Sequence, residues 1–163
     1  RILCAFGQNG TGNRKDCLMC TIPISLPPYP YVPGRNARHP EDWFDTIKAS
    51  VSSDVALSAL GQTQAWQAGL VYFDAGYFWE CHEVVEAVWL CTPDGSVERE
   101  MTQALIQLAN ARLKLRMQKY RAVARLCDMV EQHLVNCPKD HPILGLTVTD
   151  MRARVMATRG SLI

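Results

Sequence analysis

The sequence predicts an all-α protein, a bundle of five to six helices preceded by an extended, Pro-rich N-terminal arm. Two observations support this fold class. Apolar residues recur with the helical period in several consecutive segments, and no segment shows the strict alternation typical of a β-strand. The length of 163 residues suits one domain. We therefore expect an irregular arm over residues 1–36 and a single helical domain over residues 37–163.

The composition is that of an ordinary globular protein, with 48% hydrophobic and 20% charged residues. The net charge of +1 argues against nucleic acid and against a membrane surface as the main partner. No apolar run is long enough to span a bilayer, and residues 1–25 lack the pattern of a signal peptide. We therefore expect a cytoplasmic protein with its seven cysteines reduced. Its partners stay open, a second copy of the chain among them.

The first part of the arm shows no periodicity. Cys17 and Cys20 form a lone CxxC pair, which needs two further ligands to hold zinc. The best available are Cys137 and His141, more than a hundred residues away. A loosely packed arm without zinc is therefore the favoured interpretation.

Residues 26–34 hold four prolines, which fix φ and keep the preceding residues out of the helical region. This segment is therefore predicted to be extended. It contains the PxxP spacing that SH3-type domains bind. We favour the alternative in which Tyr29 and Tyr31 pack onto the helical domain.

The first helix is predicted to start near Pro40, because proline suits the first helical position and acidic residues follow it. Its apolar stripe would consist of Trp43, Phe44, Ile47 and Val51. The next helix, from about residue 64 to residue 74, follows a Gln-Thr cap and presents the side chains of Ala65, Trp66, Leu70 and Phe73.

Four more helices follow Gly76, which separates the second helix from the third. The turn at residues 92–96 and the stop at Cys137-Pro138 bound two of them. The last is capped by Thr147 or Thr149. The expected spans are residues 77–90, 98–117, 119–136 and about 147–158.

The helix over residues 77–90 carries the most unusual set of side chains. On a helical wheel, five residues form its core face: Phe78, Cys81, Val84, Val85 and Val88. Glu80 and Glu83 lie opposite, toward solvent or a cleft. A strip of Trp79, His82, Glu86 and Trp89 runs between these two faces. His82 and Glu86 are four residues apart and therefore adjacent.

The following helix places Gln103, Gln107 and Asn110 on one face. Arg112 projects into the apolar face of the same helix, where an arginine is rarely left unpaired. Glu86 or Glu83 would be its natural partner. His133, on the helix over residues 119–136, is interpreted as a satisfied core histidine rather than a further ligand.

Charge is distributed unevenly along the chain. Seven acidic residues and one basic residue lie between Asp74 and Glu100, whereas six basic and no acidic residues lie between Arg112 and Arg125. We interpret the two blocks as complementary within the bundle. The alternative is a small ligand or nucleic acid bound by the basic block, although Arg112, Lys114 and Arg116 spread over different helix faces.

Two motifs together resemble the domain of unknown function family 309. The first is G-Y-F-W-E-x-H-E-x-x-E-x-x-W over residues 76–89, and the second is L-I-Q-L-A over residues 105–109. The resemblance covers about residues 64–135 and implies a small all-helical bundle. Proteins of this family are sometimes labelled predicted metal-dependent hydrolases. The motif positions are Trp79, His82, Glu83, Glu86, Trp89 and Gln107.

Two functions fit this central helix. The favoured one is a non-enzymatic or partner-binding module, in which His82 bonds Glu86 or Gln107 inside a buried polar network and Arg112 neutralises the acidic residues. The alternative is a metal-dependent hydrolase. There, by analogy with H-E-x-x-H, His82 and Glu86 would bind zinc, manganese or iron and Glu83 would act as general base.

Overall fold

The computed structural model describes residues 23–162, so the prediction for Cys17 and Cys20 lies outside the described residues. Within these residues the chain forms helices and no strand, which confirms the all-α fold class. The helical segments are α1 (Asp45–Lys48), the 3₁₀ helix η1 (Leu57–Gln62), α2 (Gln64–Asp74), α3 (Phe78–Leu90), α4 (Val97–Arg116), α5 (Tyr120–Val135) and α6 (Val148–Gly160).

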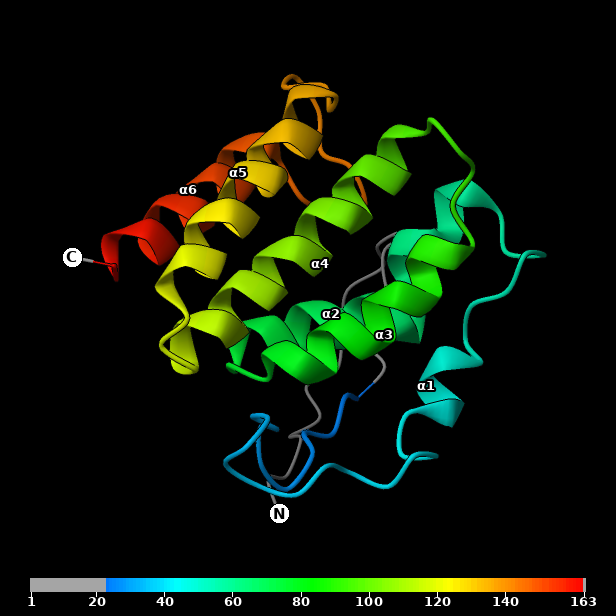
Figure 1. Cartoon of the computed structure of the whole chain (residues 1–163). Coiled ribbons are helices and arrows are strands. Elements are labelled where there is room, and N and C mark those ends of the chain that lie inside the picture. The colour runs from blue at the N-terminus through cyan, green and yellow to red at the C-terminus, as the bar shows by residue number, and fades with distance from the viewer. Residues whose placement is uncertain (1–22, 163) are drawn as a thin grey trace, which may run out of the picture.

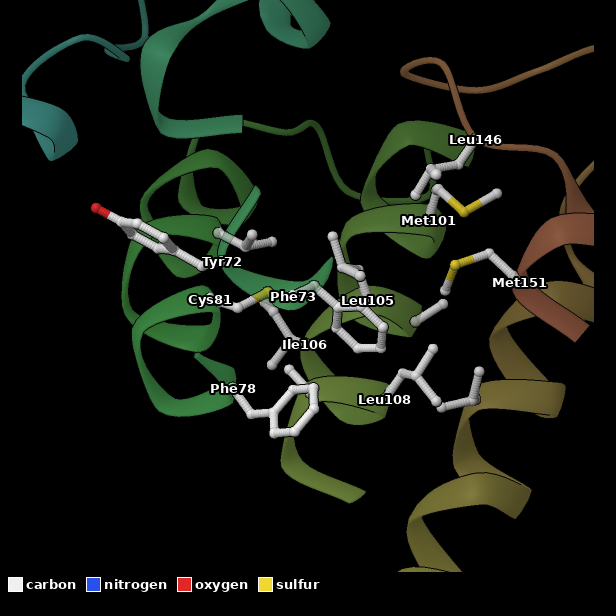
Figure 2. Close-up of a cluster of buried hydrophobic side chains, with 14 of the residues drawn as sticks. Tyr72, Phe73, Phe78, Cys81, Met101, Leu105, Ile106, Leu108, Leu146 and Met151 are labelled. Carbon is white, nitrogen blue, oxygen red and sulfur yellow. The ribbon is translucent and has the colours of Figure 1, made fainter. Parts of the chain in front are cut away.

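The long helix α4 lies between the other helices of the bundle (Figure 1). α3 packs on one of its sides and α5 on another, while α2 covers α3 and α6 covers α5. Apolar side chains from α2, α3, α4 and α6 meet in one continuous core, including Phe73, Phe78, Leu105, Leu108 and Met151 (Figure 2). In residues 23–162 we find no helix with the length and hydrophobicity that a membrane crossing requires.

Side-chain caps explain where three of the helices begin. The hydroxyl oxygens of Thr63, Ser96 and Thr147 accept hydrogen bonds from the third residue of α2, α4 and α6 respectively. Each bond satisfies a backbone donor that has no partner inside its helix. The cap of α6 is therefore Thr147 rather than Thr149, and the predicted start of α2 is confirmed.

The predicted helix from Pro40 is wrong over most of its length, because only Asp45–Lys48 is helical. The rings of His39 and Phe44 both pack against Trp79, with centroid distances of 6.2 and 6.0 Å. The chain between them follows its contacts with this distant ring rather than the helical period. Trp43, assigned to the apolar stripe, is 44% exposed.

The prediction that Glu80 faces outward is also wrong, because this side chain is completely buried. Its Oε1 accepts a hydrogen bond from the backbone N–H of Tyr31 at 2.6 Å and lies 2.8 Å from Nε2 of buried His39. Oε2 has no hydrogen-bond partner among the described residues. The arm thus covers the side of α3 that a helical wheel assigns to solvent.

Aromatic contacts hold the same part of the arm. The ring of Tyr31 meets Trp79 edge-on at 4.9 Å, and Tyr29 stacks on His39 at 4.9 Å. The guanidinium of Arg38 lies 5.1 Å from the centre of the Trp79 ring. The packing of both tyrosines onto the domain is confirmed. Trp79, one of the motif positions, anchors the arm.

The tight packing of α2 on α3 yields a first prediction. A Cβ added at Gly69 would overlap Cγ2 of buried Val85, whereas one added at Gly160 in α6 would meet no atom. We expect Gly69→Ala to lower the free energy of unfolding by roughly 1–3 kcal/mol, because neither buried helix can yield freely. Gly160→Ala, the control, should be neutral or stabilising. Urea unfolding of both variants measures this, and equal stabilities would contradict the packing.

The buried carboxylate yields a second prediction. Glu80→Ala leaves the imidazole of His39 and the N–H of Tyr31 buried without their partner. We expect a loss of roughly 3–5 kcal/mol in stability, together with faster proteolysis of the peptide bonds around residues 29–39. Glu86→Ala, on the exposed side of the same helix, should leave arm proteolysis unchanged. Unchanged cleavage in Glu80→Ala would show that the arm does not depend on this carboxylate.

Candidate functional site

Three side chains of α3 gather at one place on the surface. His82, Glu83 and Glu86 each offer one metal-ligating atom, and these atoms all lie within 4.8 Å of one another. One helix supplies all three, because Glu86 lies four residues after His82 and three after Glu83 and is therefore a neighbour of both on the helix surface. We refer to His82, Glu83 and Glu86 as the His–Glu–Glu cluster.

Asn110 of α4 orients the imidazole of His82. Its Oδ1 lies 2.7 Å from Nδ1 of His82 and accepts the Nδ1 proton. In a neutral imidazole the lone pair is then on Nε2, which lies 3.6 Å from Oε2 of Glu86. Two electron-pair donors therefore face each other, an arrangement that a cation between them stabilises. Metal-binding histidines are commonly fixed in this way through their second nitrogen.

Lys48 of α1 orients Glu83 from the opposite side. Its Nζ lies 3.1 Å from Oε2 of Glu83. Lys48 therefore bonds only one of the two carboxylate oxygens of Glu83. The cluster thus lies on the part of α3 between α4, which supplies Asn110, and α1, which supplies Lys48.

The cluster is open to solvent rather than enclosed in the interior. The side chains of His82, Glu83 and Glu86 are 30%, 20% and 49% exposed. This polar network was expected to be buried. It is partly exposed instead, because α4 and α1 cover only two of its sides. The buried polar side chain of α3 is Glu80, which contacts His39. The helical wheel assigned Glu80 to the solvent side.

Two further motif residues lie outside the cluster. Gln107 makes no side-chain hydrogen bond within residues 23–162, and Asn110, one turn later on the same face, bonds His82 instead. The recurrence of amide side chains on that face was the signal for Asn110. Trp89 lies under the guanidinium of Arg99 at 4.2 Å, and Nη1 of Arg99 also donates to the Trp89 carbonyl oxygen. These contacts with Arg99 hold Trp89 at the C-terminal end of α3, outside the cluster.

The predicted pairing of Arg112 with Glu83 or Glu86 is wrong. Its guanidinium lies 5.2 Å from the centre of the Phe78 ring, and no carboxylate among the described residues is within 4 Å of it. Asn110 and Arg112 are two positions apart on α4, so they point to different sides of the helix. Only Asn110 reaches the cluster.

The basic block does not neutralise the acidic block through ion pairs. Within residues 23–162, none of its six side chains comes within 4 Å of a carboxylate. The acidic residues instead pair with bases elsewhere, as in Lys48–Glu83, Arg99–Asp94 and Arg154–Asp74. This differs from the expected complementarity, because α4 directs Arg112 and Arg116 toward Phe78.

His133 is satisfied by Glu100, with its Nδ1 2.9 Å from the carboxylate, but it is half-buried rather than a core residue. Partial burial raises the pKa of Glu100, but hydrogen bonds from His133 and Asn136 outweigh it and hold that pKa below its ordinary value. Burial also raises the pKa of the Cys137 thiol to about 11, so this thiol stays protonated at neutral pH.

A hollow of about 530 Å³ lies apart from the cluster. Residues of η1, α2, the start of α4 and the loop at 141–145 line it, among them Gln67, Glu98 and His141. The hollow and the cluster share no residue. The grouped ligand atoms on α3 are therefore the stronger candidate for chemistry.

One comparison with known families found a match. Residues 66–126 match the family model described as Domain of unknown function (DUF309). The comparisons with curated proteins and with solved structures found no match. The matched segment contains most of α2, all of α3 and α4, and the start of α5, and so holds both the His–Glu–Glu cluster and Asn110. The match covers fewer than half of the 163 residues, so it shows that this segment is similar to the DUF309 family.

Proposed function

We propose that this protein binds one divalent transition metal through His82, Glu83 and Glu86 and that the bound metal activates water for hydrolysis. One observation carries the proposal: three ligand atoms lie together on an exposed strip, and Asn110 fixes the His82 tautomer that a metal requires. Imidazole and carboxylate ligands suit zinc, manganese and iron.

The spacing of the ligand atoms supports binding. Atoms about 2.1 Å from a tetrahedral zinc ion lie roughly 3.4 Å apart. Nε2 of His82 and Oε2 of Glu86 are 3.6 Å apart, and the whole cluster spans no more than 4.8 Å. Small rotations about the glutamate side-chain bonds are enough to close this difference. The helix itself need not move.

The number of ligands favours a catalytic metal over a structural one. Structural zinc sites use four protein ligands, whereas catalytic sites use three and leave a position for water. No fourth His, Cys, Asp or Glu joins the cluster among residues 23–162. The exposed side of Glu86 leaves room for water and a substrate, and a bound zinc ion lowers the pKa of such a water to about 7.

Glu83 has two candidate roles, metal ligand and general base. We assign it as the third ligand, since one of its carboxylate oxygens lies within 4.8 Å of the ligand atoms of His82 and Glu86, and Lys48 bonds only one of its two oxygens. The same lysine reduces the net negative charge of two carboxylates placed close together. Hydrolysis would then rely on the metal-bound water, with no carboxylate of α3 as separate base.

The metal itself is the first test. Purified protein, dialysed against zinc or manganese and then against buffer, should retain close to one equivalent by elemental analysis. We expect His82→Ala and Glu86→Ala to abolish retention while remaining folded, because both side chains are partly exposed. Asn110→Ala should weaken affinity by about 10–100-fold. His141→Ala, which alters an exposed histidine outside the cluster, is the control.

If wild-type protein stays metal-free and His82→Ala lowers the melting temperature by many degrees, the cluster is a structural network and the hydrolase proposal is wrong.

The role of Glu83 is the second test. We expect Glu83→Gln to weaken metal affinity about as much as Glu86→Ala does, measured by competition with a chromogenic chelator. A general base contributes about 10²–10⁴-fold to rate and nothing to metal affinity. Full metal retention in Glu83→Gln, combined with such a loss in hydrolysis of p-nitrophenyl acetate, would show that Glu83 is the base instead.

A further inference from the structure

The hollow between η1, α2, the start of α4 and the loop at 141–145 has room for a small molecule, with a volume of about 530 Å³. Its wall is partly apolar and includes the side chains of Leu57, Leu70, Val97 and Ile143. A few polar side chains border the same space. An apolar wall with a small number of polar groups is the usual composition of a ligand pocket.

One wall of the hollow is a tight turn that the rest of the fold holds in place. Ile143 and Leu146 exchange both backbone hydrogen bonds, and Leu144 between them has a φ of 52°, which is unfavourable for leucine. The carbonyl oxygen of Leu144 accepts a hydrogen bond from Nε1 of Trp66 at 2.8 Å. Gly61 permits this close approach, since a Cβ there would lie 3.3 Å from Cα of Leu144. The hollow is therefore preformed, and a ligand need not order this turn on binding.

Two polar side chains of the lining keep a hydrogen-bond acceptor free. Nε2 of Gln67 donates to the carbonyl oxygen of Gly61 at 2.6 Å, and the amide oxygen of Gln67 stays available. Nδ1 of His141 lies 2.9 Å from Oδ1 of Asp140 and donates its proton there. A neutral His141 then carries its lone pair on Nε2. Both side chains thus offer acceptors to a ligand that brings donors.

Glu98 gives the hollow a negative charge. Its half-buried carboxylate forms no ion pair and no side-chain hydrogen bond within residues 23–162. No lysine or arginine of these residues lines the hollow. The α4 dipole favours acidic residues in the first turn, but it does not supply a hydrogen-bond donor to this side chain. A carboxylate beside an apolar wall is stabilised by a cation that also donates hydrogen bonds.

We propose that the hollow binds a small organic ammonium ion. Its hydrocarbon part contacts the apolar wall, and its N–H groups donate to Glu98 and to the free acceptors of Gln67 and His141. An ammonium group has three donors and no acceptor, which matches this lining. A carboxylate or phosphate ligand would be repelled by Glu98. The hollow shares no residue with the His–Glu–Glu cluster, so this binding does not depend on a metal.

The test is titration of the isotope-labelled full chain with cyclohexylammonium chloride in EDTA at constant ionic strength, followed by the backbone amide signals in NMR. We expect saturable shifts concentrated at lining residues, among them Gly61, Val97 and Gly145. Cyclohexanol, which has the same ring without the charge, should bind about tenfold or more weakly. Methylammonium, which has the charge without the ring, should also bind more weakly, because it buries little apolar surface.

A variant pair tests the role of the carboxylate. Glu98→Gln keeps the length of the side chain and removes its charge, so cyclohexylammonium should bind about tenfold more weakly while cyclohexanol binds as before. The unchanged cyclohexanol affinity shows that the hollow is still formed. Glu41→Gln, an equal loss of charge at an exposed residue outside the lining, is the matched control and should bind as wild type does.

Three results would overturn the proposal. The first is the absence of saturable shifts with cyclohexylammonium. The second is equal affinity for cyclohexylammonium and cyclohexanol, or equal affinity of wild type and Glu98→Gln for cyclohexylammonium. The third is a set of shifts centred on His82 and Glu86, which would place the ammonium ion at the metal-free cluster instead. Because EDTA is present throughout, none of these results depends on the hydrolase proposal.

Discussion

The buried carboxylate of Glu80 connects the N-terminal arm to the helix that carries the candidate site. A carboxylate in the interior is tolerated only when hydrogen bonds replace water, and the arm supplies them through Tyr31 and His39. Around this contact the arm rings pack onto Trp79. The arm, α2 and α4 therefore cover three sides of α3, and the side left over presents the His–Glu–Glu cluster.

The pairing of α3 with α4 then divides the chemistry along their length. Near the middle, Asn110 orients His82 toward Glu86, which prepares an imidazole lone pair for a cation. Near the start of α3, Phe78 holds Arg112 and Arg116, which face no carboxylate. One helix pair thus holds the polar cluster and, about one helical turn along α3, a cation–π contact of two arginines with one ring.

Most of the fold was accessible from local patterns. The helical period, the Thr caps, the turn at residues 92–96 and the Gly and Pro stops place α2 to α6 within a residue or two of their observed ends, because these signals act within one or two turns. The core face of α3 was likewise correct from Phe78 to Val88. The region around α1 was not, since His39 and Phe44 follow distant partners rather than their own periodicity.

The sequence by itself therefore determined helices α2 to α6, the core face of α3 and the three residues of the cluster, all of which depend on spacing along the chain. Only the tertiary structure decided that Glu80 is buried, that Asn110 rather than Gln107 bonds His82, and that Arg112 packs on Phe78 instead of pairing with an acid. Each of these depends on which element covers a given helix face. A helical wheel has no information about a neighbour 28 or 49 residues away.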